Sequence, residues 1–597
     1  MSPTYEKIYK KIIGQKDIPV ESQKKKKEGE SISEKNEDTS VAIEPIIKKV
    51  GESTIIEETE PKSDTLTPIS SDTIWVETEK IIAGIVEAGA KIISLKMKEY
   101  RVDHTNARNK KNLSCDLVEL VPLESKGGCG VSINTKSFDR ARFICDEGEY
   151  NGKKIRIKEK DSIVLSFHFR DSLSGKEMKK IYTFNGNTYK IGMQIKSNEL
   201  CGNRITISWM AGIHESEQNK IGFYRTEERK INYAGDKSVS HIKATKLPPT
   251  NYENPESGSY RWIGISSKYF FIGLVADTSK DADLKVIAFE EKKNEQKDRK
   301  KDNVKRINYS FSFQYTEESE CAHFWVYAGP AKYKTLKSYK LEFEQILFPV
   351  LSWVRMILWC DYWFPPLAEF VLWLLLGFYA LVKDYGVAII LLTILSKLVT
   401  YPLTLSSMKS MNRMRDIQPK INALRAKHKS NPKKMNEEIM ALYKAEGVNP
   451  LNPGCLPMFL QMPIFISLFI VLQRAIELRG AATVLLPWVQ DLSKPEAIFY
   501  LPGNGLPLYG SNFAILPIVM AILTFFQNKM TIKDPNQKMM IYFMPIFMLV
   551  LFNGFPSGLV LYWTMQSALQ LVQQLYTDNK KKKMVQPAPV RPTVRKK

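Results

Sequence analysis

The segment GVAIILLTILSKLVTYPL, residues 386–403, decides the fold class of this chain, because it has the length and apolarity of a membrane-spanning helix. Its only charged residue is Lys397. A lysine near the middle of a bilayer costs roughly 2.5 to 3.5 kcal/mol on insertion scales, so a compensating polar environment is expected. On a helix, spacings of four, three and four residues place on one face Thr393, Lys397, Thr400 and Thr404. We therefore expect this helix to line a hydrated groove inside the membrane.

Lys397 also has a simpler interpretation. Because the apolar segment ends near Thr404, the long lysine side chain could reach the cytosolic interface instead of a groove. The hydroxyls of Thr393 and Thr400 could bond the backbone of their own helix. The sequence leaves both interpretations open.

Four further apolar segments downstream predict membrane helices, which gives five core spans. Some are shorter than the usual span of about 20 residues, so tilting or local bilayer thinning is implied. Gln461 in the second span, with Trp563 and Gln566 in the fifth, could join Lys397 in the groove. Gln461 could equally form a hydrogen bond between two helices, and tryptophans in spans more often pack or lie at the interface. The segments run over about Leu456–Leu472, Phe513–Phe526, Met539–Phe552 and Leu559–Leu575.

A charged stretch, Ser406–Asn452, separates the first two spans. Its apolar residues repeat every three or four positions on either side of Asn431-Pro432, which predicts an antiparallel helical hairpin outside the membrane. The hairpin contains ten Lys and Arg residues and the tail Lys580–Lys597 adds more, whereas the connection Arg479–Ser511 has few. By the positive-inside rule, the hairpin and the tail face the cytosol.

The half of the chain that precedes the spans has a different pattern. Residues 1–73 are rich in Lys, Glu, Ser and Thr and predict disorder. From Ile74 to about Tyr339, short segments with β-branched and aromatic alternation predict an antiparallel β-sandwich. The clearest of them are Ser162–Phe169, Lys180–Phe184, Arg204–Trp209, Tyr260–Ile265, Phe270–Val275, Tyr309–Tyr315 and His323–Tyr327.

Between the β-rich half and the spans lies the amphipathic stretch Pro366–Val382, which either crosses the membrane or lies in its interface. With five spans and a cytosolic tail, the β-domain lies outside and needs an export signal before it. Residues 1–73 contain no apolar run of that kind. Either an anchor precedes this sequence or Pro366–Val382 spans and the β-domain stays in the cytosol. We favour the first alternative.

Composition narrows the function classes. The formal charge of +22 is concentrated beside the apolar segments, which favours anionic lipid as a partner over a specific nucleic-acid sequence. The seven cysteines are scattered without a C-x-x-C motif, so we expect neither a metal site nor a full disulfide framework, although one bridge within the β-domain stays open. No phosphate-binding loop motif appears, and the six histidines show no spacing to carboxylates that suggests catalysis. A transporter or channel, and an enzyme built on the β-domain, are the alternatives to a non-enzymatic role.

Several motifs occur in the order found in one protein family. The longest is YKAEGVNPLNPGCLP at residues 443–457, followed by QMPIF at residues 461–465. The others are YPLT (401–404), QPK (418–420), ELR (477–479), FPSGLVLYW (555–563) and, upstream, WMAGI (209–213), YAGP (327–330) and LKSY (336–339). With these motifs the chain resembles the YidC-type bacterial membrane protein insertases over roughly Ile74 to Tyr576. The resemblance is strongest after Gly386.

The resemblance implies a protein of the bacterial inner membrane that inserts and helps to fold integral membrane proteins, alone or with the Sec translocon, through a hydrophilic intramembrane groove. It implies no cofactor, and its partners would be nascent membrane proteins, the Sec translocon, the ribosome and signal recognition components. Lys397 stands at the family's groove arginine, so it keeps the charge but loses the planar, multi-donor fork. The family's first membrane anchor has no match before the β-domain, which supports an anchor upstream of this sequence.

The predicted architecture is therefore multi-domain: an antiparallel β-supersandwich in the periplasm precedes an α-helical transmembrane bundle with five core spans. The candidate groove residues are Lys397, Thr393, Thr400, Gln461, Trp563 and Gln566. The expected boundaries are 1–73 for the disordered segment, 74–342 for the β-domain, 343–385 for the amphipathic region, 386–576 for the core with its hairpin at 406–452, and 577–597 for the basic tail.

Overall fold

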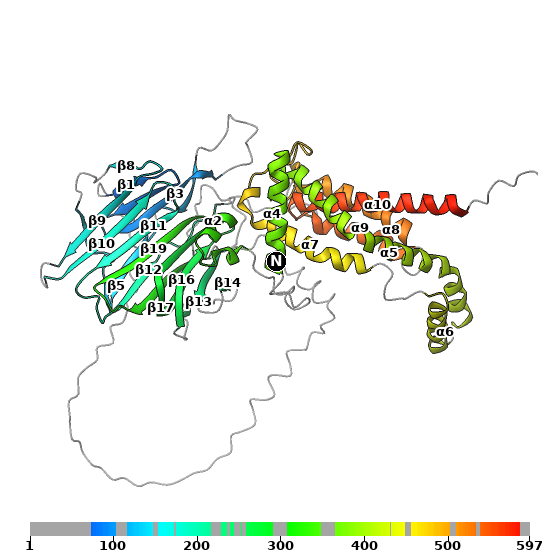
Figure 1. Ribbon diagram of the computed structural model, residues 1–597, viewed down its shortest axis with the longest axis horizontal. Coiled ribbons are helices and arrows are strands. Elements are labelled where there is room, and N and C mark those ends of the chain that lie inside the picture. Colours follow the sequence, from blue (N-terminus) through cyan, green and yellow to red (C-terminus); the bar gives the residue numbers. More distant parts are fainter. Residues whose placement is uncertain are drawn as a thin grey trace, which may run out of the picture. The chain divides into compact units, whose positions relative to one another are not determined.

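The computed structural model describes most of the chain from Thr73 to Val585 (Figure 1). The segment 1–72, predicted to be disordered, and the end of the tail, 586–597, lie outside the described residues. The described ranges are 73–102, 116–123, 125–146, 153–171, 175–216, 229–235, 239–243, 252–253, 258–290, 307–347, 364–429, 431–447, 455–501, 509–510, 512–532 and 538–585.

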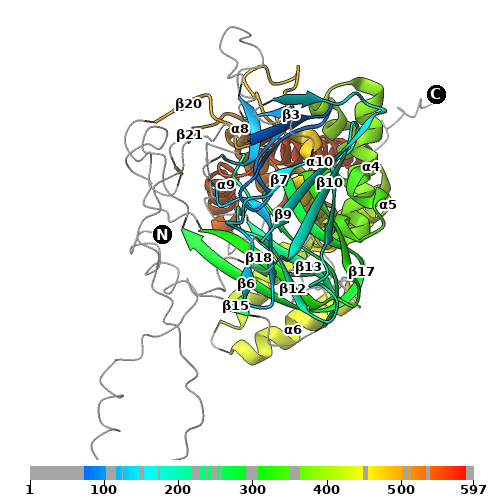
Figure 2. The same ribbon diagram turned by 90° about the vertical axis from the view of Figure 1, so that its left-hand side faces the viewer.

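Within its described residues, the β-domain forms one hydrogen-bonded sheet of 19 strands that folds into a sandwich, as the alternating segments predicted. β12 pairs antiparallel with β18 on one side and with β5 on the other; Figure 1 labels β12 and β5, and Figure 2 labels β12 and β18. One pair departs from the antiparallel expectation, since β1 runs parallel to β8. The strands are β1 (Thr73–Glu77), β2 (Ile81–Val86), β3 (Lys91–Arg101), β4 (Leu117–Val121), β5 (Gly128–Ile133), β6 (Lys136–Ser137), β7 (Ile144–Cys145), β8 (Lys154–Arg156), β9 (Ser162–Arg170), β10 (Glu177–Asn185), β11 (Lys190–Lys196), β12 (Arg204–Trp209), β13 (Lys230–Gly235), β14 (Val239–Lys243), β15 (Tyr252–Glu253), β16 (Gly258–Ser266), β17 (Phe270–Glu290), β18 (Ile307–Thr316) and β19 (Cys321–Pro330).

The seven strands named from the sequence are all present, but one is much longer than predicted. β17 extends over 21 residues, whereas the alternation indicated only Phe270–Val275. Its first part pairs with β19 as far as Ala276, and its second part pairs with β18 from Ala282 onward. The polar residues between the two parts show no alternation, so the sequence did not indicate that the strand continues. The strand is continuous because β19 pairs with its first part and β18 with its second.

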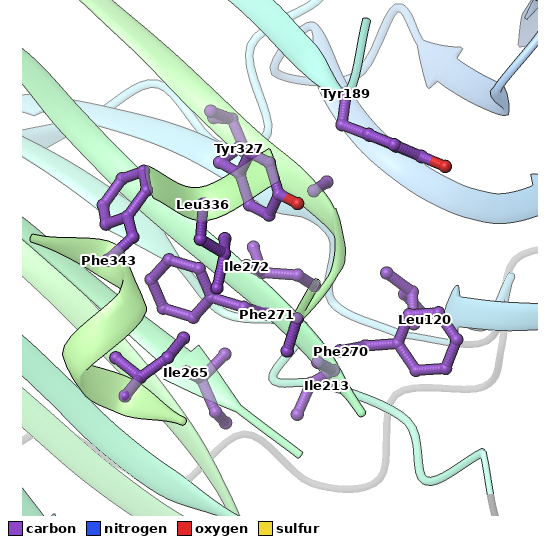
Figure 3. Packing of buried hydrophobic residues seen from close by; sticks show 14 of the residues in the cluster. Leu120, Tyr189, Ile213, Ile265, Phe270, Phe271, Ile272, Tyr327, Leu336 and Phe343 are labelled. Atoms are coloured by element: carbon purple, nitrogen blue, oxygen red, sulfur yellow. The ribbon is translucent and has the colours of Figure 1, made fainter. Parts of the chain in front are cut away.

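Two short helical turns after the last strand close one end of the β-domain core. The helix α2 (Tyr333–Ser338) buries Leu336, and the turn η5 (Phe343–Ile346) buries Phe343. Figure 3 shows both side chains beside Phe271 and Tyr327. The ring of Phe343 lies 5.2 Å from that of Phe271, in edge-to-face geometry. Phe343, which the sequence assigned to the amphipathic region, therefore belongs to the β-domain core.

A fully buried lysine joins three segments of this domain. The Nζ atom of Lys180 on β10 donates to the carbonyl oxygens of Gly89 at 2.6 Å and Cys129 at 2.9 Å. It also lies 5.4 Å from the centroid of the Phe143 ring. Burial lowers the pKa of the Lys180 ammonium to about 8, although the neighbouring Cys129 thiol acts in the opposite direction. The thiols of Cys129, Cys201 and Cys321 are free.

The apolar half of the chain forms helices close to the predicted ones. Among the described helices, segments of α4 and α5 are long and apolar enough to span a membrane, over Pro365–Val382 and Tyr385–Pro402, while α7, α8 and α9 contain shorter apolar segments. The helices are α4 (Phe364–Val382), α5 (Tyr385–Lys427), α6 (Pro432–Ala445), α7 (Cys455–Arg474), α8 (Leu516–Thr531), α9 (Lys538–Phe552) and α10 (Ser557–Val585).

The largest difference concerns α5. The sequence predicted that the first span ends at Leu403, but α5 is 43 residues long and continues through Pro402 and Pro419 into the hairpin, as far as Lys427. The change in hydropathy near Leu403 marks where the apolar face ends, whereas the helical hydrogen bonds continue beyond it. α10 likewise extends past the predicted end at Leu575, as far as Val585.

The hairpin of α5 and α6 has a small apolar core of its own. Ile417 and Ile421 of α5 are buried against Ile439, Leu442 and Tyr443 of α6. This contact agrees with the three- and four-residue apolar periodicity of both segments.

Asp384 fixes the start of α5. Its carboxylate accepts hydrogen bonds from the Val387 N–H at 3.0 Å and from the Thr483 hydroxyl at 2.8 Å, and a third from the Val484 N–H at 2.7 Å. Burial alone would raise the pKa of Asp384, but the hydrogen bonds outweigh burial and hold it below its ordinary value. A Cβ atom on the adjacent Gly386 would lie 2.2 Å from the Thr483 hydroxyl oxygen, so glycine permits this close approach.

We expect Asp384→Ala to lower the free energy of unfolding by about 1 to 2 kcal/mol at pH 7, because helix capping is lost. Since the folded-state pKa of Asp384 is depressed, its contribution is present above the ordinary carboxyl range and is lost as the pH falls through the folded-state pKa. Thermal unfolding of the full chain in detergent should show a difference from the unmodified protein that shrinks between pH 7 and pH 3. A difference that stays constant over this range would contradict the charged cap. Glu79→Ala, at an exposed position, is the control.

Candidate functional site

The helical region brings two predicted groove residues into direct contact. The Nε2 atom of Gln566 on α10 donates to Oε1 of Gln461 on α7 at 3.0 Å. The Nε2 atom of Gln461 in turn donates to the hydroxyl of Tyr562, one helical turn before Gln566. These three side chains form a polar chain between α7 and α10.

Lys397 lies in the same part of the bundle. Its Nζ atom donates to Oε1 of Gln570, which is four residues after Gln566 on α10, and its side chain is half-buried. An amide oxygen of a neighbouring helix therefore holds the ammonium. The role of Lys397 as a groove residue stays a prediction.

Gln570 was not predicted as a groove residue from the sequence. The signal was present, since α10 contains glutamines at positions 566, 570, 573 and 574, and spacings of three and four residues place several of them on one face. A polar residue near the end of an apolar segment is easily assigned to the interface. The contact with Lys397 identifies Gln570 as part of the cluster.

The threonine hydroxyls of α5 donate hydrogen bonds to the backbone of the same helix. The hydroxyl of Thr393 donates to the Ile389 carbonyl at 2.7 Å, and that of Thr400 donates to the Ser396 carbonyl at 2.9 Å. Both side chains are buried. The structure shows hydrogen bonds from these hydroxyls to the backbone of their own helix. Their role as groove contacts stays a prediction.

Trp563 packs among aromatic rings. Its ring lies 5.0 Å from Phe465 in edge-to-face geometry and 5.5 Å from Phe552. This arrangement matches the packing alternative given for it, and direct contact with a substrate stays a prediction. Trp563 follows Tyr562 directly, so the aromatic cluster lies beside the polar chain of glutamines.

Some polar atoms near the cluster have no hydrogen-bond partner within the described part of the chain. They are Oε1 of Gln566 and both terminal atoms of the Gln573 side chain, all of which are shielded from solvent. A buried amide without a partner costs roughly 1 to 3 kcal/mol by mutational data. These atoms therefore have spare hydrogen-bonding capacity next to Lys397 and Gln570.

An apolar crevice of about 400 Å³ opens between α8 and α9. Its lining contains no polar side chain, so it suits hydrocarbon. The residues that line it are Ile518, Ala521, Ile522, Phe525, Phe526, Pro545, Ile546 and Leu549. Across the residues that the structure describes, no group of three or more His, Cys, Asp or Glu side chains could hold a metal ion.

Comparisons with known proteins cover nearly all of the described chain. A family model described as "YidC periplasmic domain" matches residues 73–373, and one described as "60Kd inner membrane protein" matches residues 377–584. A protein of Chlorobium luteolum named "Membrane protein insertase YidC" is 34% identical over 440 residues, which are 71% of this chain and 69% of that protein. A protein of the same name from Chlorobaculum tepidum is 30% identical over 522 residues, with 85% of this chain and 82% of that protein covered.

Among solved structures, the crystal structure of an active YidC insertase covers 85% of this chain and 93% of its own, with 18% identity and a TM-score of 0.35. The family follows from the sequence relatives and from the two family models, whose matches together include both the β-domain and the helices. The chain belongs to the YidC family of membrane protein insertases.

Proposed function

We propose that this protein inserts integral membrane proteins by lowering the barrier for a polar segment to cross hydrocarbon. The observation that carries the proposal is the polar cluster within the apolar helices, in which Lys397 contacts Gln570 while Gln461 contacts Gln566. A substrate's polar flank would replace or extend these hydrogen bonds during its passage. The cluster thus offers the flank partners that lipid cannot offer.

The driving force would come from the substrate itself. An apolar segment gains about 0.8 kcal/mol for each CH₂ group that it transfers from water to hydrocarbon. The apolar crevice of α8 and α9 and the exposed apolar side chains of these helices offer a surface beside which such a segment can enter lipid. The protein then has only to reduce the polar cost, which needs no nucleotide.

The proposal includes an orientation and partners. The hairpin and the C-terminal tail would face the cytosol and the β-domain the periplasm of a multi-pass inner-membrane protein. The basic hairpin, with Lys420 paired to Glu446 at 2.6 Å, would meet anionic lipids, the ribosome and signal recognition components. Insertion would proceed alone or with the Sec translocon. The β-domain would serve as a scaffold or partner surface.

The test is insertion by the purified full chain. It is reconstituted into liposomes that contain phosphatidylglycerol, and a single-span substrate is synthesised beside them. We expect a protease-protected fragment of the substrate to form several times faster than with empty liposomes. Equal rates with and without the protein would contradict the proposal.

A further inference from the structure

The glutamines of α10 form a regular ladder. Relative to Gln566, the positions of Gln570 and Gln573 are rotated by about 40° and −20° on a helix of 3.6 residues per turn, so all three share one narrow face. The rise between them is about 6 Å and about 4.5 Å. Thr577, next on this face, donates its hydroxyl to the Gln573 carbonyl at 2.8 Å, which ends the ladder.

Each rung has hydrogen-bonding capacity to spare. A carboxamide has two N–H donors and an acceptor oxygen with two lone pairs. Gln566 uses an N–H toward Gln461, but its oxygen has no partner among the described residues. Gln570 uses its oxygen for Lys397, and neither terminal atom of Gln573 has a partner within the same described set. The unused groups include both donors and acceptors, so the ladder can bind neutral polar groups and has no preference for a charge of either sign.

An extended polypeptide has the complementary pattern. Its peptide groups advance by about 3.3 Å per residue, so groups that point the same way recur at about 6.6 Å. This repeat is close to the rise of about 6 Å between Gln566 and Gln570, whereas the step of about 4.5 Å from Gln570 to Gln573 is shorter. In an extended segment the N–H and C=O of one residue point to the same side, and a single carboxamide can pair with both. Recognition of this kind does not depend on the side chains of the bound segment.

We propose that Gln566, Gln570 and Gln573 bind the main-chain amides of an extended polar segment, which displaces the packing that shields their terminal atoms; Lys397 keeps the contact with acidic side chains that belongs to the proposed insertase groove. The inference rests on the proposed insertase function and divides its groove into two kinds of contact. Sequence-independent hydrogen bonds would accept any flank, and one cation would select among flanks.

Two substrates that differ only in the flank separate the two contacts. One has an acidic flank and the other a Ser/Gly flank of equal length. In the reconstituted full chain, we expect Gln573→Leu to slow insertion of both substrates by the same factor, about two- to tenfold for one lost hydrogen bond. We expect Lys397→Met to slow only the acidic one. Gln490→Leu, the same change at an exposed position outside the apolar helices, is the matched control and should behave as the unmodified protein.

Thermal stability provides the readout that a purely structural role would not produce. Because the Gln573 side chain has no partner among the described residues, Gln573→Leu should leave the unfolding temperature unchanged or raised while insertion falls. Unchanged insertion of both substrates by Gln573→Leu would overturn the ladder, as would a loss confined to the acidic flank. If the unmodified protein inserts neither substrate, it is the proposed function that fails, and the ladder fails with it.

Discussion

Changing Lys397 to glutamate will lower insertion of a single-span substrate with an acidic flank by about tenfold to a hundredfold. Hydrogen bonds to charged groups contribute about 1.5 to 3 kcal/mol, and reversal of the charge replaces attraction by repulsion. Lys397→Ala should have a smaller effect in the same direction. The rate of fragment protection in proteoliposomes measures the loss, and elution of each variant as a single species in detergent shows that it remains folded.

Two comparisons make this prediction specific to the groove. Lys383→Ala removes a lysine at an exposed position just before α5 and should insert the substrate as the unmodified protein does. Lys397→Arg keeps the charge and should retain most of the activity. Unchanged insertion by Lys397→Ala would instead support a lysine that merely reaches the interface, in spite of its contact with Gln570.

The buried lysine of the β-domain leads to the largest expected effect on stability. With the pKa of Lys180 at about 8 in the folded protein and near 10.5 in the unfolded chain, the unfolded chain binds one more proton between these values. Stability therefore rises with pH through this window, by about 1.4 kcal/mol per pH unit and by about 3 kcal/mol in all. Below pH 8 the burial penalty on the charged form is fully present.

Denaturant unfolding followed by tryptophan fluorescence measures this effect, since Trp209 and Trp262 are buried in the same domain. The free energy of unfolding of the full chain minus that of Lys180→Met should increase between pH 8 and pH 10.5. The exposed Lys158→Met should give a difference that does not change with pH. A flat profile for Lys180→Met as well would mean that the ammonium is hydrated in the folded protein.

The interior strands show what local pattern could predict. β12 has the bounds that its alternation indicated, because it is paired on both sides and each of its faces has one environment. β17 shows the limit, since its partner changes from β19 to β18 along its length and its polar middle carries no alternating signal. Pairing between distant segments extended the strand beyond its local pattern.

The candidate site was also predictable only in part. The residue types were visible, because a lysine or a glutamine in an apolar segment is costly wherever it lies. Their partners were not. Spacing places Lys397 on a face of α5, but only the packing of α5 against α10 brings it to Gln570, and only packing with α7 joins Gln461 to Gln566. In the same structure, Thr393 forms a hydrogen bond with the backbone of its own helix, and Trp563 packs against aromatic rings.

The amino-acid sequence by itself determined which segments are apolar, where the polar exceptions lie on each helix, and to which family the chain is similar, because these properties depend on composition and on short periodic spacing. Tertiary structure alone decided which exceptions meet, how far α5 and β17 extend, and that Lys180 is enclosed by Gly89 and Cys129. The reason is that a hydrogen bond or a buried charge depends on two groups, and only packing brings together groups that lie far apart in the sequence.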